Sequence, residues 1–330
     1  MTYDLITIGE ALLRMSPPRY VQLRRTPSLN VVAVGSQLNV AANFARLGKE
    51  AAFITKLPDN PLGLLVRDTC MGYGLDVSHI RMVPGAKMGV TYVEFSITPR
   101  APVAVYDRAG SAASTISPDN FNWDEILSTT KYAYTDGIFP GLSPSCSEST
   151  DLFFRAAKRH GCTTCFDVNY REHLWTPDAA CASWSRILPQ IDILVTNRGV
   201  SETVFGRPAS DTDEEMMRFY ADEFGCKIIC LTSREIMGTE KGAWSSKALT
   251  VDGIVHGKRY EFDIVDRYGT GDAWFAGFLY GLAEKDAAYG LEFGNAMCAL
   301  AHTIEGDVAH VTPDDVRAIM TDNIDLRVRR

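Results

Sequence analysis

The hydrophobic pattern of this chain consists of short apolar runs separated by longer stretches of mixed polarity. Each run is brief and almost continuously apolar, which is typical of parallel strands that are covered on both faces. Six runs are predicted to be such strands: Leu5–Gly9, Ala52–Thr55, Tyr132–Ile138, Thr164–Val168, Ile191–Thr196 and Lys227–Thr232. The sequence therefore favours one buried, mainly parallel sheet.

The stretches between these runs carry helix start and stop signals. Gln37–Leu47 ends at Gly48, a residue type that commonly closes a helix. Asn60-Pro61 and Thr312-Pro313 each combine a capping residue with a proline suited to the first helical position. Strands that alternate with helices predict an α/β fold, in which helices flank a doubly wound parallel sheet.

Two segments, Leu12–Val34 and Val90–Tyr106, break this alternation. They contain period-two stretches, with prolines at turns, and therefore predict antiparallel strands outside the main sheet. We interpret them as one small β lid, residues 12–34 and 90–106. The α/β core would then comprise residues 1–11, 35–89 and 107–330. The alternative is a pair of ordinary surface hairpins.

Composition and charge narrow the class of protein. The net charge is −8, so there is no basic surplus to displace counterions from a nucleic acid. No run reaches the roughly 18 apolar residues that a membrane span needs. The N-terminus lacks the basic region and long apolar run of a signal peptide. We expect a cytoplasmic protein that binds neither nucleic acid nor membrane.

The eight cysteines are scattered, which in a chain without an export signal suggests reduced thiols. Cys162 and Cys165 match a C-x-x-C pattern that redox or zinc sites use. No second such pair accompanies them, and they lead into a predicted strand. Two small buried residues are therefore the favoured interpretation.

The run Asp266–Asp272, with the sequence D-R-Y-G-T-G-D, is followed directly by an apolar stretch. It predicts a tight glycine turn that opens a buried helix, where unpaired N–H groups and the helix dipole favour an anion. A carboxylate at Asp272 would repel that anion unless it accepts a proton from a hydroxyl that attacks a bound phosphoryl group. The alternative is an acidic residue favoured by the dipole alone. The small residues Ala273, Gly277 and Gly281 are expected to pack this helix closely on the sheet.

This run resembles the D-T-x-G-A-G-D signature of the ribokinase (phosphofructokinase-B) family of sugar kinases. The resemblance implies that Asp272 is the catalytic base and that Gly269, Thr270 and Gly271 form the anion hole. Thr270 stands where the family usually has Ala. Arg267 follows the first Asp of the signature, where the family usually has Thr, and in this the run resembles the 2-keto-3-deoxygluconate kinase branch. In this family the lid covers the sugar and often pairs with the lid of a second subunit, so we expect a homodimer.

A second motif, Gly35–Ala41, resembles the family's G-G-x-x-x-N-x-A signature, with Val34 in place of the first glycine. Gly35 would let a sugar approach the backbone closely. The resemblance implies that Asn39 hydrogen-bonds a sugar hydroxyl, although a plain polar position on a helix is the alternative. Glu10 follows the first strand, where sheets of this kind place ligand contacts, but a solvated edge carboxylate is nearly as good an interpretation.

Two arginine motifs point to an acidic sugar. The stretch Asp167–Trp175 resembles the D-x-N-x-R-x-x-L-W of 2-keto-3-deoxygluconate kinases, which implies Asn169 near the ATP phosphates and Arg171 near the substrate carboxylate. A guanidinium pairs bidentately with a carboxylate. Tyr106–Ala112 resembles the Y-x-R-x-G-S-A segment, which implies Arg108 as a second cation at the acid end or near the transferred phosphate. Further pocket residues implied by the resemblance are Tyr92 and Tyr106 from the lid and Asp307 from a Gly-Asp loop.

The nucleotide side matches the family less well. Asn197 fits the first position of N-x-x-E, but Val200 stands where the glutamate is expected, so the metal ligands stay unknown. Glu202 could substitute only through a changed backbone path. Thr232 follows a strand where the family places a nucleotide-loop residue, and the stretch 233–238 departs from T-x-G-x-x-G. Asn295 and Ala299 are candidate walls of the adenine pocket or ordinary core positions.

These observations favour an enzyme with ATP and Mg²⁺ as cofactors that phosphorylates a small acidic keto sugar. The resemblance implies 2-keto-3-deoxygluconate, phosphorylated at its 6-hydroxyl, with ADP as the other product. Another kinase of the same fold, acting on fructose, ribose or a different keto-deoxy acid, stays open. A non-catalytic sugar-binding regulator is a second alternative. A nicotinamide oxidoreductase is weaker, because the glycine turn lacks the third glycine of G-x-G-x-x-G.

Overall fold

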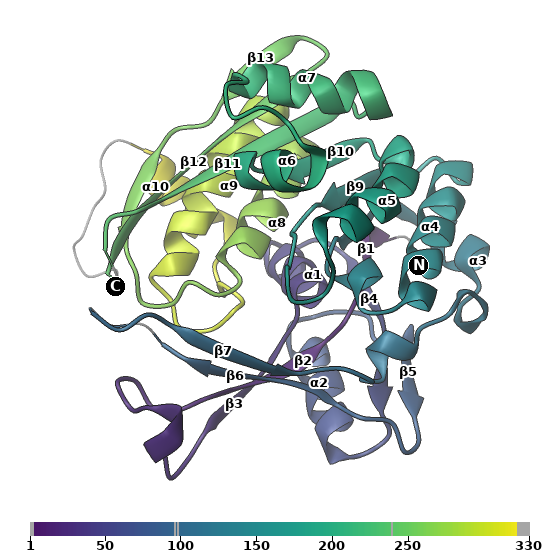
Figure 1. The fold of residues 1–330 in the computed structure, drawn as a ribbon, viewed down its shortest axis with the longest axis vertical. Coiled ribbons are helices and arrows are strands. Elements are labelled where there is room, and N and C mark those ends of the chain that lie inside the picture. Colours follow the sequence, from purple (N-terminus) through teal and green to yellow (C-terminus); the bar gives the residue numbers. More distant parts are fainter. Residues whose placement is uncertain (1–2, 96, 98, 239, 322–330) are drawn as a thin grey trace.

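Two β-sheets organise the molecule, a large central sheet and a small sheet beneath it (Figure 1). The computed structural model describes residues 3–95, 97, 99–238 and 240–321. The large sheet has the spatial order β13 (Gly253–His256), β12 (Lys241–Thr250), β11 (Ile228–Ile236), β10 (Ile193–Thr196), β9 (Thr163–Asp167), β8 (Thr130–Asp136), β1 (Tyr3–Ile8), β4 (Ala51–Pro58) and β5 (Ile80–Val83), and β14 (Tyr260–Asp263) pairs with β12. The small sheet has the order β3 (Asn30–Val34), β2 (Leu12–Ser16), β6 (Gly89–Glu94) and β7 (Val103–Asp107).

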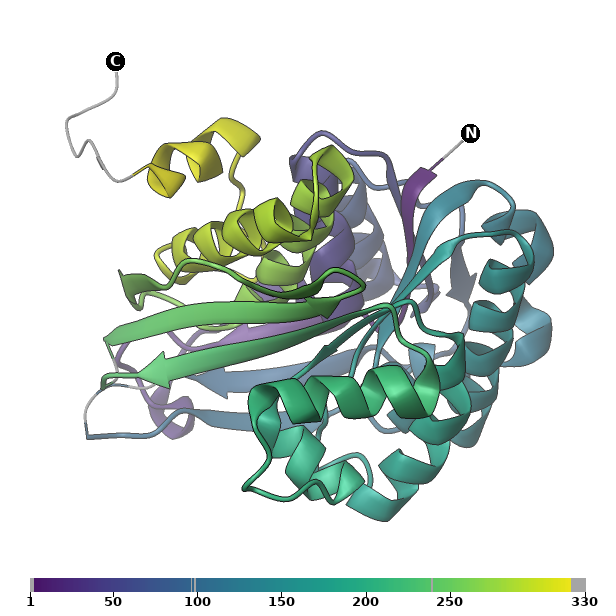
Figure 2. The ribbon, with the colours of Figure 1, turned by 90° about the horizontal axis from the view of Figure 1, so that it is seen from above.

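Helices cover both faces of the large sheet (Figure 2). One face carries α1 (Ser36–Arg46), α2 (Pro61–Gly72), α8 (Thr270–Glu284), α9 (Ala287–His302) and α10 (Pro313–Met320). The other carries α3 (Trp123–Leu127), α4 (Pro144–Arg159), α5 (Pro177–Ile187), α6 (Arg198–Phe205) and α7 (Asp213–Phe224). Each layer buries its own hydrophobic core against the sheet. The predicted ribokinase-like α/β architecture is confirmed.

The order of the parallel strands reverses at β1. Strand β1 pairs in parallel with β4 on one side and with β8 on the other. The next strands in the sequence, β4 and β5, therefore lie on one side of β1, and β8 to β11 lie on the other. Parallel pairing continues from β8 through β9 and β10 to β11. All six predicted strands lie in this sheet. Their carboxyl ends meet at one edge, which is where sheets of this type bind ligands.

The antiparallel end of the large sheet was not expected. The stretch after Thr232, predicted as a modified nucleotide loop, instead continues β11 as far as Ile236. It pairs with β12, so that Thr232 lies opposite Ser246 and Arg234 opposite Trp244. The loop prediction was wrong because a departure from a glycine-rich motif does not reveal what replaces it.

The glycines of α8 pack on a helix, not on the sheet as predicted. A Cβ at Gly277 would lie 3.0 Å from the Gly294 Cα, and a Cβ at Gly281 would lie 2.7 Å from the Gly290 Cα. The small residues of α8 and α9 thus let the two helix backbones approach closely. This contact fixes α8, and with it the glycine turn at its start.

The small sheet joins two antiparallel pairs, β2 with β3 and β6 with β7, through a parallel pairing of β2 with β6. Opposite residues of neighbouring strands share a face. Arg14, Thr91 and Tyr106 form one row across the sheet and face the large sheet's strand ends. The next row, displaced by one residue, faces away.

Among the described residues, none of the helices is long and apolar enough to cross a membrane. The cysteines are free thiols, and Cys162 and Cys165 are both buried. Burial raises the pKa of both thiols, and Cys162 Sγ lies 3.2 Å from the carbonyl of Leu127. The interpretation of this pair as small buried residues is confirmed.

Candidate active site

A cleft of about 860 Å³ lies between the small sheet and the strand ends of the large sheet. Arg14, Thr91 and Tyr106 line it from the small sheet. From the large sheet come Asp167 at the end of β9 and Thr232 on β11. The glycine turn and the start of α8 close one side. The cleft therefore brings together segments from nearly the whole chain.

Asp272 lies in the first turn of α8, where it lines the cleft. Ser36 Oγ donates a hydrogen bond to Asp272 Oδ1 at 2.7 Å, and Asn39 Nδ2 donates to Oδ2 at 2.8 Å. Both donors belong to the first turns of α1, so the turn after β3 holds the carboxylate in one orientation. A carboxylate fixed in this way can act as a general base for a bound hydroxyl.

The surroundings of Asp272 also set its proton affinity. Burial raises the pKa of Asp272 from 3.8 to about 6. The hydrogen bonds from Asn39 and Ser36 lower the pKa again, because they favour the ionised carboxylate, whereas the nearby Asp136 raises it. The group is therefore ionised at neutral pH and still basic enough to take a proton.

We expect kcat/KM to fall as the pH drops below about 6, because a base with this pKa becomes protonated there. A pH–rate profile between pH 5 and 8.5 measures this limb. Ser36→Ala removes one hydrogen bond to the ionised form, so the limb should move to higher pH. A flat profile, or a limb that Ser36→Ala leaves in place, would contradict the assignment of the limb to Asp272.

The glycine turn is held by its own signature residues. Gly269 has a φ of +70°, and a Cβ there would lie 2.1 Å from the carbonyl oxygen of Asp307, so only glycine fits. Asp266 Oδ1 accepts hydrogen bonds from the N–H groups of Arg267 and Tyr268 at 2.7 and 3.1 Å. The space beside Gly271 is open. The N–H groups at this helix start are thus available to an anion in the cleft.

A chain of polar contacts connects Asp272 to two further carboxylates. Asn169 Nδ2 donates to Ser36 Oγ at 3.3 Å and to Asp136 Oδ2 at 2.8 Å. The N–H of Asn169 also donates to Asp167 Oδ1 at 2.9 Å. Burial and the neighbouring Asp136 together raise the pKa of Asp167 from 3.8 to about 7. Carboxylates that repel one another in this way make the region favourable for a cation.

The opposite part of the cleft contains paired charges. The Arg108 guanidinium binds the buried Glu10 carboxylate, with Nε donating to Oε2 at 2.8 Å. Ser111 Oγ also donates to Glu10. Arg14 forms ion pairs with Asp266 at 3.1 Å and with Asp307 at 2.6 Å. These groups present hydrogen-bonding atoms to the cleft, but their charges are largely compensated.

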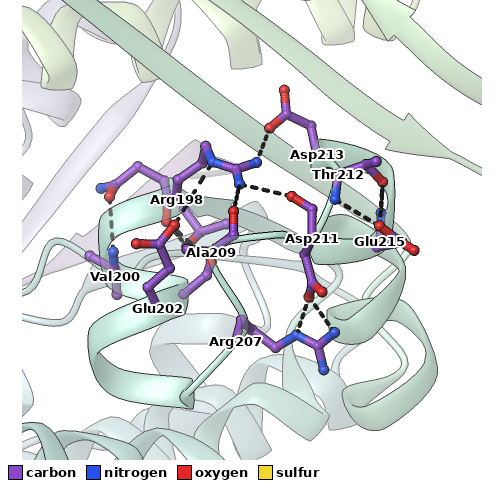
Figure 3. Close-up of polar contacts among 12 residues, drawn as sticks. Arg198, Val200, Glu202, Arg207, Ala209, Asp211, Thr212, Asp213 and Glu215 are labelled. Atoms are coloured by element: carbon purple, nitrogen blue, oxygen red, sulfur yellow. Dashed lines mark hydrogen bonds and ion pairs between the residues drawn. The ribbon is translucent and has the colours of Figure 1, made fainter.

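The strand β10 leads into the part of the cleft that Asn197 lines. Asn197 caps α6, and its Oδ1 accepts the N–H of Val200 at 3.1 Å. Helix α6 is regular, so Glu202 does not line the cleft but faces Arg198, with a closest charge separation of 3.9 Å. Figure 3 shows Arg198 between Glu202 and Asp213. The Arg198 Nη1 atom lies 2.6 Å from Asp213 Oδ1. Glu202 thus does not replace the glutamate that is missing at Val200.

Comparison with known proteins identifies the family. The family model described as "pfkB family carbohydrate kinase" matches residues 2–313. The chain belongs to the pfkB family of carbohydrate kinases. It is 34% identical to a 2-dehydro-3-deoxygalactonokinase of Haloferax volcanii, with 97% of each chain covered. A crystal structure of a 2-dehydro-3-deoxygluconokinase from Thermotoga maritima is 30% identical and superimposes with a TM-score of 0.92, covering 97% of this chain and 98% of the other.

A more distant structure shares the fold. It comes from E. coli, is described as a ribokinase II in complex with ATP and Mg²⁺, and is 17% identical. The TM-score is 0.84, and the match covers 96% of this chain and 99% of the other.

Most of the predicted site residues of this pfkB kinase line the cleft. These are Gly35, Asn39, Tyr106, Arg108, Asn169, Arg171, Asn197, Thr232, Gly269, Thr270, Gly271, Asp272 and Asp307. A Cβ at Gly35 would lie 2.2 Å from the carbonyl oxygen of Glu10, so this glycine permits a close backbone contact as well.

Three predicted residues lie elsewhere. Tyr92 is on the opposite face of β6, because its neighbours Thr91 and Val93 take the cleft face. Asn295 is fully buried in α9, where its amide binds Ser246 Oγ at 2.6 Å, Trp274 Nε1 at 2.9 Å and the carbonyl of Lys258 at 2.9 Å. Ala299 is also buried and does not line the cleft. Among the described residues these three are therefore core or outer-face positions.

Some site residues were not anticipated. Asp136 and Asp167 end β8 and β9, so their position at the carboxyl ends of parallel strands was a usable signal. Ser36 lies within the predicted Gly35–Ala41 motif, directly after its glycine. No sequence signal marked Arg14 as a site residue. A charged residue in a predicted lid strand does not indicate that its side chain forms ion pairs with Asp266 and Asp307.

Proposed function

We propose that the protein is an ATP-dependent kinase of a small acidic keto sugar, most directly 2-keto-3-deoxygluconate, phosphorylated at its 6-hydroxyl. The observation that carries this proposal is that one cleft holds both a fixed carboxylate, Asp272, beside a helix start suited to an anion, and a guanidinium, Arg171, that forms no ion pair with a described carboxylate. The names of the two similar kinases of keto-deoxy sugar acids support this substrate class.

In the proposed reaction the sugar hydroxyl lies against Asp272. The carboxylate takes the hydroxyl proton while the sugar oxygen forms a bond to the γ-phosphorus of ATP. The bond from that phosphorus to the β,γ-bridging oxygen breaks, and ADP leaves. The N–H groups at Gly269, Thr270 and Gly271 stabilise the charge on the transferred group, because they already point to where that charge develops.

Arg171 would bind the substrate carboxylate. Its side chain is exposed in the cleft, and its hydrogen bond within the described residues goes to the carbonyl of Tyr170, at 3.2 Å. No described carboxylate forms an ion pair with it. The Arg108 fork is occupied by Glu10, so this pair fits sugar hydroxyls better than a second carboxylate contact. Gly35, Asn39, Tyr106 and Asp307 would complete the sugar site.

The nucleotide would lie along the ends of β9, β10 and β11, against Asn169, Asn197 and Thr232. No described group of three or more acidic, histidine or cysteine side chains is arranged to hold a metal. Mg²⁺ at kinase sites is usually held by substrate phosphates, waters and one or two carboxylates. Asp167 fits that role, because it lines the cleft and the neighbouring Asp136 raises its pKa, an effect that a bound cation would oppose. Bound there with the phosphates, Mg²⁺ would neutralise their charge.

The direct test is ADP release from ATP by the purified protein with a panel of sugars. The panel contains 2-keto-3-deoxygluconate, its galactonate epimer, 5-keto-2-deoxygluconate, fructose and ribose. Turnover with the keto-deoxy acids and not with the neutral sugars is expected. Turnover with fructose or ribose alone would favour a neutral-sugar kinase instead.

A non-catalytic sugar-binding regulator is the second candidate, since Val200 and the β11–β12 hairpin depart from the family's nucleotide motifs. Calorimetric sugar binding without turnover of any sugar in the panel would favour it. A cytoplasmic location stays a prediction.

A homodimer through the lid also stays a prediction. Val31, Met15, Tyr92 and Val105 form one apolar row on the face of the lid away from the cleft. Val105 is 52% exposed and belongs to an edge strand, which favours pairing with another chain. We expect light scattering at micromolar concentration to give a dimer, and Val105→Asp to give a monomer. The control is Val251→Asp, at an exposed position on a turn of the large sheet. A monomeric wild type would contradict the prediction.

A further inference from the structure

Arginines line much of the cleft, and they differ in how their charge is compensated. Three are paired with described carboxylates: Arg14 with Asp266 and Asp307, Arg108 with Glu10, and Arg198 with Asp213. Arg171 and Arg234 form no ion pair with any carboxylate in the described part of the chain. Arg171 is assigned above to the sugar carboxylate. Arg234 has no role in the mechanism so far.

Arg234 lies next to the glycine turn. Its Nη2 donates a hydrogen bond to Thr270 Oγ1 at 3.1 Å, and Thr270 is the first residue of α8. The guanidinium also stacks over the Trp244 ring, 5.3 Å from its centroid. Trp244 is the cross-strand neighbour of Arg234 in the β11–β12 hairpin. A hydroxyl and an aromatic ring thus hold the cation in place without neutralising it.

Two departures from the family pattern meet in this contact. Thr270 stands where the signature usually has Ala, and an Ala side chain would offer Arg234 no acceptor. Arg234 lies in the stretch where T-x-G-x-x-G is expected and a strand is found. Together they place a guanidinium beside the anion-binding turn.

The electrostatic setting suits an anion. Partial desolvation in the cleft lowers the pKa of Arg234, and the charges of Arg267 and Arg171 lower it further, whereas the Asp272 carboxylate raises it. A cation disfavoured by its surroundings in the free protein gains most when an anion arrives. Besides Asp272, which takes the proton, the negatively charged group of the proposed reaction nearest to this position is the phosphoryl group that the glycine turn would bind.

We propose that Arg234 binds the transferred phosphoryl group of ATP, and that Thr270 and Trp244 are the positioning residues that aim it. This inference rests on the proposed ATP-dependent kinase function. The guanidinium forms and breaks no covalent bond. It stabilises the negative charge on the phosphoryl oxygens as the group passes from ADP to the sugar oxygen, and the proton goes to Asp272.

The test uses Arg234→Gln in the full-length protein, with Arg218→Gln as the charge-matched control. Arg218 lies on the exposed surface of α7, where it pairs with Glu214. Loss of one preorganised donor should lower kcat about 100- to 1000-fold. The KM for the sugar should stay within about twofold. Calorimetry should show weaker ATP binding and unchanged AMP binding, because AMP lacks the phosphoryl group that Arg234 contacts.

Thr270→Ala tests the positioning role. It restores the family's usual residue, so folding should tolerate it. Loss of this hydrogen bond, whose donor is a charged guanidinium, should lower kcat about 10- to 150-fold. In the Arg234→Gln background the same substitution should have no further effect, since the two residues act as a unit.

Three results would overturn the inference: near-normal kcat in Arg234→Gln, equal weakening of ATP and AMP binding, or a selective rise in the sugar KM. The nucleotide measurements need no sugar. If the wild type turns over none of the sugars, the proposed function fails, and the comparison of ATP with AMP still decides the role of Arg234.

Discussion

Asp272→Asn should lower kcat by about 100- to 10,000-fold, the usual effect of losing a general base. The substitution keeps the size of the side chain and leaves the glycine turn intact, so ATP affinity should change little. The measurement is single-turnover phosphorylation with calorimetric ATP binding alongside. Turnover near that of the wild type would remove Asp272 from the mechanism.

The same substitution should not destabilise the protein at high pH. In the folded state the pKa of Asp272 is raised from 3.8 to about 6, so the ionised carboxylate costs stability above pH 6. At about 1.4 kcal/mol per pKa unit this cost is on the order of 3 kcal/mol, offset in part by the hydrogen bonds that Asn would lose. The variant's gain in melting temperature should therefore be largest above pH 6 and should shrink toward pH 4.

Asp222→Asn, an exposed position on α7, is the matched control and should show no such pH-dependent gain. A variant of Asp272 that is less stable than the wild type at pH 8 would indicate that the carboxylate holds the turn together. Its loss of activity would then not report on proton transfer.

The strands of the core were predictable because burial on both faces leaves nearly continuous apolar runs. The strands β12, β13 and β14 form the antiparallel end of the sheet and follow a stretch that departs from a known motif, and no continuous apolar run marks them. Tyr92 shows a second limit. In a strand a shift of one residue reverses the face, and the sequence of β6 does not state which face meets the cleft.

The site residues also divide into those that the sequence predicts and those that only the fold brings together. Asp272 and its glycine turn were predictable, because a local signature determines a local geometry. The contacts of Arg14 with Asp266 and Asp307 join residues more than 250 positions apart, so they depend on how the small sheet packs against the rest of the protein. Asn295 was a candidate wall of the adenine pocket. Its amide oxygen instead accepts hydrogen bonds from Ser246 and Trp274, and its amide nitrogen donates one to the carbonyl of Lys258.

Arg171→Ala should raise the KM for 2-keto-3-deoxygluconate far more than the KM for ATP. Removing one partner of a charge-assisted pair in a closed pocket costs about 2–5 kcal/mol. This corresponds to roughly a 30-fold to several-thousand-fold loss. We expect a loss at the lower end of this range, because the Arg171 side chain is exposed in the free cleft. Water can therefore partly solvate the substrate carboxylate in the variant.

The design of this experiment has to separate two effects of Arg171. Its charge also lowers the pKa of Asp272, so its loss shifts the acid limb to higher pH. Kinetics at pH 8.5 and above the shifted limb leave the carboxylate contact as the main difference. Neutral sugars, if they are used at all, should then be little affected, whereas both keto-deoxy epimers should lose equally because they share the carboxylate. Equal losses on acidic and neutral sugars would mean that Arg171 positions phosphate or supports the fold. The assignment of an acidic substrate would then be withdrawn, and a sugar kinase of unspecified substrate charge would remain.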